Sequence, residues 1–365
     1  MQQNMLMKTI NTKIELDINE ELKNILNKDL QYTIPIFIPH KGCKNECVFC
    51  NQRKISGKIK SVTVKDVENE IKKHLKYFEN VKNKTEKVKI QLAFFGGSFT
   101  GISIKEQIKY LEVANKYIKN GKIDSIRLST RPDYIYPKIL KMLKEYNVQT
   151  IELGVQSMDN EVLNSSKRGH SKKEVMRASR LIKLFGFELG HQLMIGLPNS
   201  NLSKEIYSIN ECLKYNPINL RIYPVYVINP SELYDMYVEG KYIPLNLDEA
   251  INRTYEVIKE CKKSDVKIIR IGLQSTDEIT SNNEGLFGPV CDNFAEYVLA
   301  KFAYEKLDKK ISDTLKNLKL NDNEKLNIEV ITNKKYISIV SGPKKINKEK
   351  LKNKYRINDI KIKGE

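Results

Sequence analysis

Short apolar segments alternate with helical patterns along most of this 365-residue chain, and this alternation limits the folds that it can adopt. The apolar segments, which have the length and composition of buried strands, are residues 34–38, 89–95, 125–129, 150–154, 188–195, 219–227 and 266–271. Between these segments, apolar residues recur with the spacing of a helix, at residues 62–80, 103–120, 137–146, 172–185, 203–215 and 247–261. Strands that alternate with helices form right-handed βαβ units and a parallel sheet. About six such repeats predict an α/β fold, a partial TIM barrel of the (β/α)6 type.

Polar and glycine-rich segments follow the predicted strands, where such a barrel places its active face. They are the cysteine-containing loop after Pro39, Gly96-Gly97-Ser98, Ser129-Thr130-Arg131, Gln156-Ser157 and Gly196-Leu197-Pro198. We therefore expect the chemistry on one rim of the barrel.

The chain is long enough for roughly two domains. We expect a polar N-terminal arm at residues 1–30, the barrel and its extension at 31–310, and a small basic αβ module at 321–365. The module carries twelve basic and six acidic residues. Its patterns are a strand at 326–331, a helix at 336–340, the turn Gly342-Pro343-Lys344-Lys345, a helix at 347–355 and a strand at 357–362.

The charge balance favours a polyanionic partner such as RNA. The formal net charge is +18, and Lys and Arg attract phosphate and release its counterions. Only ten of the 63 basic residues are Arg, so a codon bias toward Lys explains the excess equally well. No apolar run approaches the roughly 20 residues of a membrane span, and residues 1–30 lack the features of a signal peptide. We expect a cytoplasmic protein that has no membrane partner.

Three of the six cysteines form the pattern C-x3-C-x2-C at Cys43, Cys47 and Cys50. Three thiolates are an incomplete set for structural zinc, unless His40 supplies the fourth ligand. They can hold three irons of a 4Fe–4S cluster and leave the fourth iron open to a small molecule. The other cysteines, at 212, 261 and 291, are scattered, and we expect them to be ordinary buried residues.

With Phe49 before the last cysteine, this triplet resembles the hallmark of the radical S-adenosylmethionine (radical SAM) superfamily. The resemblance implies that Cys43, Cys47 and Cys50 bind a 4Fe–4S cluster whose free iron binds S-adenosyl-L-methionine. An electron from the cluster, supplied by a donor such as ferredoxin or flavodoxin, then cleaves the sulfonium to a 5′-deoxyadenosyl radical. It also implies a radical SAM type of partial barrel.

The same resemblance assigns cofactor-binding residues beyond the cysteine loop. Gly96, Gly97 and Ser98 match the motif that receives the methionyl amino group, where a missing Cβ permits close backbone approach. Ser129, Gln156 and Gln192 match polar positions that contact the ribose, and Arg168 matches a basic residue that pairs with the carboxylate. Glu152 is equally explained as a structural acid that pairs with an Arg of the barrel.

Within that superfamily, residues 34–310 resemble the radical domain of the Elongator catalytic subunit. The resemblance rests on 151–157 (IELGVQS), 167–170 (KRGH), 197–199 (LPN), 221–224 (RIYP), 233–234 (LY) and 240–242 (GKY). It implies modification of tRNA uridines with acetyl-CoA as the carbon source. We expect no acetyltransferase domain after Lys309, because no glycine-rich acetyl-CoA loop follows it. The reaction on tRNA therefore stays open.

Two other functions remain open at this point. Gly154-Val155-Gln156 and Gly196-Leu197-Pro198 also occur in oxygen-independent coproporphyrinogen III oxidase, although that family usually has Tyr before the last cysteine. The other is a non-enzymatic, zinc-containing RNA-binding protein. The C-terminal module resembles a minimal KH module, whose GxxG loop clamps a nucleic-acid backbone, with Lys345 in place of the second glycine. The sequence thus favours a radical SAM enzyme that acts on RNA, most specifically tRNA.

Overall fold

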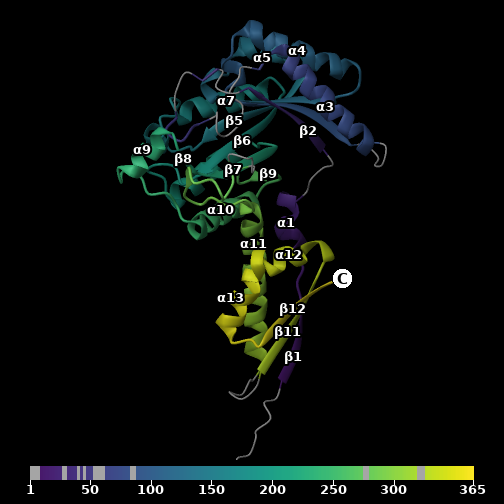
Figure 1. The fold of residues 1–365 in the computed structure, drawn as a ribbon, viewed down its shortest axis with the longest axis vertical. Coiled ribbons are helices and arrows are strands. Elements are labelled where there is room, and N and C mark those ends of the chain that lie inside the picture. The colour runs from purple at the N-terminus through teal and green to yellow at the C-terminus, as the bar shows by residue number, and fades with distance from the viewer. Residues whose placement is uncertain are drawn as a thin grey trace, which may run out of the picture. The chain divides into compact units, whose positions relative to one another are not determined.

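The computed structural model describes residues 9–26, 31–38, 42–43, 47–51, 62–82, 88–273, 279–318 and 325–365. The chain divides into two compact units (Figure 1). The larger unit comprises residues 27–292, and the smaller one combines residues 1–26 with residues 293–365.

A curved parallel sheet forms the centre of the larger unit (Figure 1). In the described part of the chain it has seven strands, β2 (Gln31–Ile38), β3 (Lys89–Gly96), β4 (Ser125–Thr130), β5 (Val148–Gln156), β6 (Glu188–Ile195), β7 (Asn219–Pro224) and β9 (Lys267–Ile271). Their order in the sheet follows their order in the chain, as consecutive right-handed βαβ units require. The predicted α/β partial barrel is confirmed, with seven strands where about six repeats were expected.

Helices connect these strands and cover the outside of the sheet (Figure 1). They are α3 (Val64–Lys82), α4 (Ile104–Lys119), α5 (Pro137–Glu145), α6 (Asn160–Ser165), α7 (Lys172–Leu184), α8 (Leu202–Leu213), α9 (Glu232–Val238) and α10 (Leu247–Cys261). Short 3-10 turns η1 (Phe99–Gly101) and η2 (Pro132–Tyr134) follow β3 and β4, and β8 (Val227–Ile228) pairs with β10 (Leu286–Phe287). Local sequence sets some helix starts: Ser171 and Glu174 form a capping box at α7.

The two faces of the sheet differ in burial. On β7, Leu220 and Ile222 are fully buried, whereas Arg221 and Tyr223 on the opposite face are half-buried. This alternation follows from the two-residue period of a strand that packs helices on one face only. We call the face that carries Arg221 and Tyr223 the inner face. Functional side chains of the sheet can therefore meet there.

The smaller unit is built around a second parallel sheet of order β1-β11-β12. Its elements are β1 (Thr9–Glu15), α1 (Asn19–Leu26), α11 (Phe294–Asn317), β11 (Lys325–Thr332), η3 (Lys334–Tyr336), α12 (Ile337–Ser341), η4 (Pro343–Lys345), α13 (Ile346–Tyr355) and β12 (Asp359–Gly364). The buried Asn347 side chain ties α13 to its neighbours by donating to the carbonyls of Ala300 and Val340 at 2.8 and 3.1 Å.

The boundaries of the compact units differ from the expected domain division in two places. Residues 9–15, expected within the polar N-terminal arm, form β1, which pairs with β11 in the register Thr9↔Lys325. Helix α11 belongs to the smaller unit from its first turn, although the barrel extension was expected to reach residue 310. The first difference comes from pairing between segments about 300 residues apart, and the second from packing of α11 on α12 and α13. Local sequence patterns report neither contact.

None of the described helices combines the length and the apolar character that a membrane crossing needs.

Candidate active site

The cysteine triplet lies in the loop after β2, at the edge where the strands of the sheet end. Cys47 is buried, Cys50 is half-buried and Cys43 is exposed. The Cys50 amide donates to the Cys47 carbonyl at 2.9 Å, which forms a tight turn. Among the described residues, no three His, Cys, Asp or Glu side chains are spaced to hold a single metal ion. Cys43 lies close enough to Cys47 and Arg131 to interact electrostatically with both. His40, the alternative zinc ligand, lies outside the described residues.

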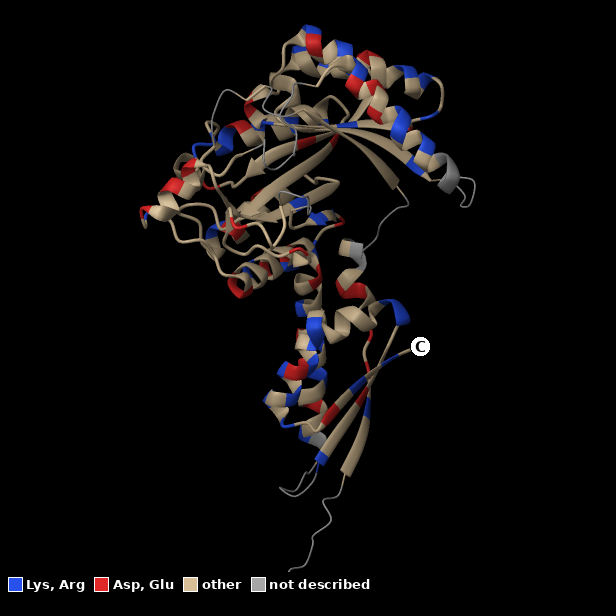
Figure 2. Ribbon diagram, viewed as in Figure 1, with Lys and Arg blue, Asp and Glu red and all other residues tan. Residues whose placement is uncertain are grey.

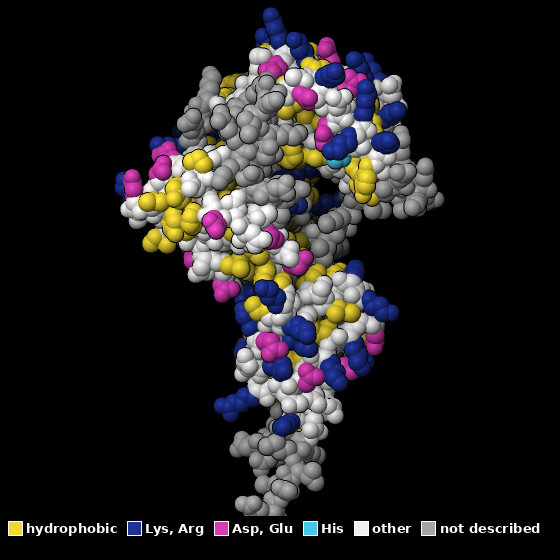
Figure 3. All heavy atoms as spheres, in the orientation of Figure 1, with side chains coloured by type: hydrophobic (Ala, Val, Ile, Leu, Met, Phe, Trp, Pro, Cys, Tyr) yellow, Lys and Arg dark blue, Asp and Glu magenta, His cyan; other side chains and the backbone are white. Residues whose placement is uncertain are grey.

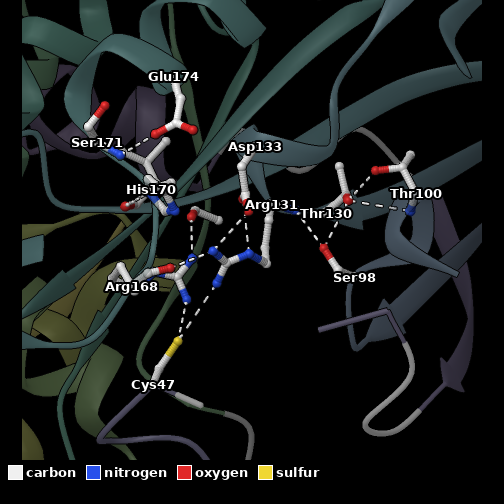
Figure 4. A network of polar contacts seen from close by, with 12 residues as sticks. Cys47, Ser98, Thr100, Thr130, Arg131, Asp133, Arg168, His170, Ser171 and Glu174 are labelled. Carbon is white, nitrogen blue, oxygen red and sulfur yellow. Dashed lines mark hydrogen bonds and ion pairs between the residues drawn. The ribbon is translucent and has the colours of Figure 1, made fainter. Parts of the chain in front are cut away.

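Two arginines point at the sulfur of Cys47 (Figure 4). Arg168 Nη1 lies 3.0 Å from the sulfur, and Arg131 Nη1 lies 4.0 Å from it. Asp133 fixes the Arg131 guanidinium by accepting from Nε and Nη2 at 2.9 and 3.1 Å. Two guanidinium groups therefore lie against the sulfur of the buried cysteine of the triplet.

Arg168 was expected to pair with a carboxylate of S-adenosylmethionine. In the structure its Nη2 donates to the Gly154 carbonyl at 2.7 Å, and its guanidinium lies 5.9 Å from the centre of the Phe49 ring. Its Nε is buried and has no hydrogen-bond partner among the described residues. Arg168 and Phe49 are thus brought together beside Cys47, and one donor of Arg168 is left for a further acceptor.

Three glycines allow the cysteine loop to lie directly on the loop after β3. A Cβ at Gly42 would lie 2.1 Å from the Ser98 carbonyl oxygen, and one at Gly101 would lie 2.0 Å from the Gly42 oxygen. Gly96 has a φ of +104°, and a Cβ there would lie 2.8 Å from the Ile38 oxygen. The Gly97 amide donates to that same oxygen at 2.8 Å. Gly96 therefore lies directly on the Ile38 backbone, and the expected approach of the cofactor to Gly96 and Gly97 stays a prediction. Sequence reasoning missed Gly42 and Gly101.

Ser98 lies in a buried cluster of hydroxyl groups (Figure 4). Its Oγ lies 3.0 Å from Thr130 Oγ1 and accepts from the Arg131 amide at 2.9 Å. Thr100 Oγ1 lies 2.6 Å from the same Thr130 oxygen. These bonds join the loops after β3 and β4 and position Arg131. The Ser98 hydroxyl was expected to contact the cofactor, and in the structure it makes contacts within the protein.

The three expected ribose contacts lie on neighbouring strands. Gln192 on β6 donates to the Gln156 side chain on β5 at 3.4 Å, and Ser129 on β4 donates to Glu152 at 3.3 Å. Gln156 adopts a left-handed φ of +66° at a bulge between β5 and β6, which sets the direction of its side chain. The structure thus brings Gln156 and Gln192 together.

Glu152 forms a buried ion pair with two arginines of the sheet. Arg127 Nη1 donates to one carboxylate oxygen at 3.0 Å, and Arg221 Nε donates to the other at 3.0 Å. The Glu152 side chain on β5 extends across β6 to contact Arg221 on β7. It passes Gly190 of β6, where a Cβ would lie 2.9 Å from the Glu152 Cγ. The interpretation of Glu152 as a structural acid is confirmed.

Replacing Glu152 with Gln should lower the free energy of unfolding by about 3 kcal/mol, because it leaves two guanidiniums without their shared counter-charge in a buried place. Urea unfolding measures this change. Glu68→Gln, which breaks an exposed pair with Lys72 on α3, is the control and should alter stability far less. Equal urea midpoints for the two variants would contradict the role of Glu152.

An apolar cluster holds the second half of the cysteine loop. Val48 is buried with Leu197 and Leu233, and Phe49 packs against the same cluster. The Leu233 amide at the start of α9 donates to the Val48 carbonyl at 2.8 Å. Sequence reasoning did not connect α9 with the cysteine loop, because the contact joins residues about 185 positions apart and has no local signal.

Comparison with known proteins identifies similar sequences for much of the larger unit. Residues 37–208 match the model of the Radical SAM superfamily, and residues 217–303 match that of the Radical_SAM C-terminal domain. A tRNA uridine(34) acetyltransferase of Methanocaldococcus infernus is 32% identical over 219 residues, which cover 54% of this chain and 39% of that protein. Elongator complex protein 3 of Homo sapiens is 31% identical over 165 residues, which cover 44% of this chain and 29% of that protein.

A solved structure of archaeal Elp3 from Methanocaldococcus infernus, with an N-terminal deletion, has a similar fold. Its TM-score is 0.60 at 25% identity, over 77% of this chain and 63% of that chain. The present chain spans well under half the length of the two curated relatives that it matches.

Proposed function

The chain belongs to the radical SAM superfamily, and from this premise we propose that it uses a 4Fe–4S cluster and S-adenosylmethionine to modify RNA, most specifically tRNA. When bound, the reduced cluster supplies the electron that cleaves S-adenosylmethionine. The donor of that electron is, in this proposal, a small redox protein such as ferredoxin or flavodoxin. We further propose that the protein acts in the cytoplasm.

The residues around the cysteine loop fit the proposed cofactors. Cys43, Cys47 and Cys50 offer three thiolates, the ligand type that iron–sulfur clusters require. The close glycine contacts at Gly42 and Gly101 fix the start of the loop. The unpartnered Nε of Arg168 is available to an anionic group such as a carboxylate.

The other proposed cofactor-binding residues lie beside the cysteine loop and along the rim of the barrel. Here Phe49, Gly96, Gly97, Ser98 and Arg168 would surround the methionyl part of S-adenosylmethionine. Ser129, Gln156 and Gln192 would face its ribose. The meeting of Gln156 and Gln192 at 3.4 Å supports this grouping.

The contact between Arg168 and the sulfur of Cys47 at 3.0 Å carries this proposal most directly, since it pairs a buried cation with a buried cysteine of the triplet. The test is anaerobic incubation of the reconstituted full chain with S-adenosylmethionine, with and without dithionite. We expect 5′-deoxyadenosine only when the reductant is present. A protein that produces none under these conditions would support the zinc alternative instead.

The proposed RNA substrate rests on charge and on the relatives. Figure 2 marks Lys and Arg positions along the ribbons of both units, and Figure 3 shows basic side chains with acidic ones among them on the face in view. The net charge is +18, and the matched curated proteins include one named for its action on tRNA uridine. Comparing modified nucleosides from cells with and without the protein tests this substrate class. A loss confined to tRNA nucleosides would support it, and identical nucleoside profiles would contradict it.

The turn between α12 and α13 is the segment of the smaller unit that we propose to contact RNA phosphate. Lys344 and Lys345 are exposed and have left-handed φ values of +51° and +62°. Lys345 stands where the KH-like pattern has glycine, and it adopts a conformation that glycine favours. The turn therefore keeps a glycine-like backbone while it presents two cations.

Replacing both lysines with Asn should weaken tRNA binding about tenfold at low salt and reduce the dependence of log affinity on log salt by about 2. Asn removes the charge and tolerates the left-handed backbone. The matched control is Lys138→Asn with Lys141→Asn, which removes two exposed charges from α5. Filter binding over a salt series measures both quantities. Equal losses in the two double variants would show a nonspecific charge effect and contradict the proposed contact.

A further inference from the structure

The inner face of the sheet carries two arginines side by side. Arg221 on β7 and Arg270 on β9 are register partners on adjacent parallel strands. Both are half-buried, and they lie on strands that the cysteine loop and its arginines do not use. The proposed cofactor site therefore leaves them without an assigned role.

The charges around this pair do not balance among the described residues. Glu152 accepts from Arg127 and Arg221, so its two oxygens are already shared by two cations. Glu188, a second acid on this side of the sheet, accepts from Gln149 and Thr150. In the described part of the chain, Arg270 Nε donates to the Gly272 carbonyl at 3.3 Å, and this acceptor carries no full charge.

Arg270 thus keeps a positive charge in a half-buried place beside another cation. Burial lowers the pKa of its guanidinium; the Tyr223 hydroxyl opposes that effect and Arg221 adds to it. Two adjacent, half-buried guanidiniums attract an anion that can lie between them and accept hydrogen bonds from both.

Aromatic rings border the same place. The Arg221 guanidinium lies 5.1 Å from the centre of the Phe95 ring, although β7 and β3 are separated by three strands of the sheet. The contact therefore spans the concave inner face. Phe37 extends the aromatic surface, with its ring centre 5.9 Å from that of Phe95. A ligand held here would place a charged end at the arginines and a flat end against the rings.

We propose that Arg270, Arg221 and Tyr223 form an oxyanion-binding subsite on the inner face, for the phosphate or carboxylate of a small aromatic or nucleotide ligand. Tyr223 lies next to the pair, with its hydroxyl 3.5 Å from Arg221 Nη1. This inference goes beyond the proposed function, because it depends on the charges of the sheet and on no bound cluster.

Calorimetric titration of the full chain tests the subsite with four probes. Uridine 5′-monophosphate and benzoate carry a phosphate and a carboxylate, and uridine and benzamide are their neutral counterparts. We expect saturable binding of at least one charged probe and none of its neutral counterpart. Binding of the phosphate probe alone would assign the subsite to phosphates, and binding of benzoate alone to carboxylates.

Arg270→Gln should weaken binding of the charged probe about tenfold, and Arg270→Lys should bind it more tightly than Arg270→Gln because it keeps the charge. Arg180→Gln, which removes an exposed arginine from α7, is the matched control and should bind as the parent does. Circular dichroism of each variant verifies the fold. Affinity unchanged by Arg270→Gln, or no binding of either charged probe, would overturn the proposal. Neither result would alter the 5′-deoxyadenosine assay, so the two proposals fail separately.

Discussion

A Cys47→Ala protein is expected to fold, to lose its visible iron–sulfur absorption, and to form 5′-deoxyadenosine at least about 100-fold more slowly than the parent. The reason is that Cys47 is the buried cysteine of the triplet and the one that two guanidiniums face. Even loss of an outer-shell partner typically costs 10–100-fold in metal affinity or activity, and loss of a ligand should cost at least as much. Absorption spectroscopy and product quantification after anaerobic reconstitution measure both effects.

Cys291→Ser is the matched control for that variant. Cys291 is half-buried in the same unit, and its backbone lies near the Tyr226 hydroxyl. We expect this variant to keep the absorption and the product yield. If Cys47→Ala also kept them, Cys47 would not be a ligand and the assignment of the triplet would be wrong.

Replacing Gly101 with Ala is the second change with a large expected effect. The added Cβ would lie 2.0 Å from the Gly42 oxygen, 2.8 Å from the Gly42 carbonyl carbon and 2.9 Å from Tyr134 Cδ2. Since two of these three atoms are backbone, the residue before Cys43 must move. We expect a loss of about 1–3 kcal/mol in the free energy of unfolding and at least about tenfold weaker iron loading.

Gly121→Ala separates a steric effect from an effect of backbone conformation. Gly121 has a φ of +64°, but a Cβ there would meet nothing within 4 Å. It should cost about 1–2 kcal/mol through the left-handed backbone alone and leave iron loading unchanged. If Gly101→Ala loaded iron as well as Gly121→Ala does, contact between Gly42 and Gly101 would not position the cysteine loop.

The fold was predictable from sequence where local patterns determine it. The seven strands of the central sheet and the helices α3, α4, α5, α7, α8 and α10 follow from apolar period and length. The shorter elements α6, α9, β8 and β10 were not predicted. The position of β1 was not predictable from sequence, because this strand becomes stable only when it pairs with β11. No property of residues 9–15 alone distinguishes an arm from such a strand.

The site was predictable to the level of motifs. The triplet and Gly96-Gly97 can be identified from their spacing in the sequence. The family model and the relatives confirm the family that this spacing indicated. Arg131 was missed as a neighbour of Cys47, because its position depends on Asp133 and on the hydroxyl of Ser98. The only local signal was its place directly after a strand, in the segment Arg131-Pro132-Asp133.

Polar residues proved the hardest to assign. Ser98 and Ser129 stay proposed cofactor contacts, and each also hydrogen-bonds within the protein, to Thr130 and to Glu152. A serine hydroxyl satisfies either role equally well in sequence, and tertiary packing decides between them. Glu152 shows the opposite case, since the buried Arg127 on β4 and the half-buried Arg221 on β7 both pair with it.

Metal analysis of the full chain after anaerobic reconstitution with iron and sulfide tests the central claim most directly. The account predicts about four irons per chain and a brown protein with charge-transfer absorption in the visible region. A colourless protein that binds no iron and already carries one zinc per chain would contradict it.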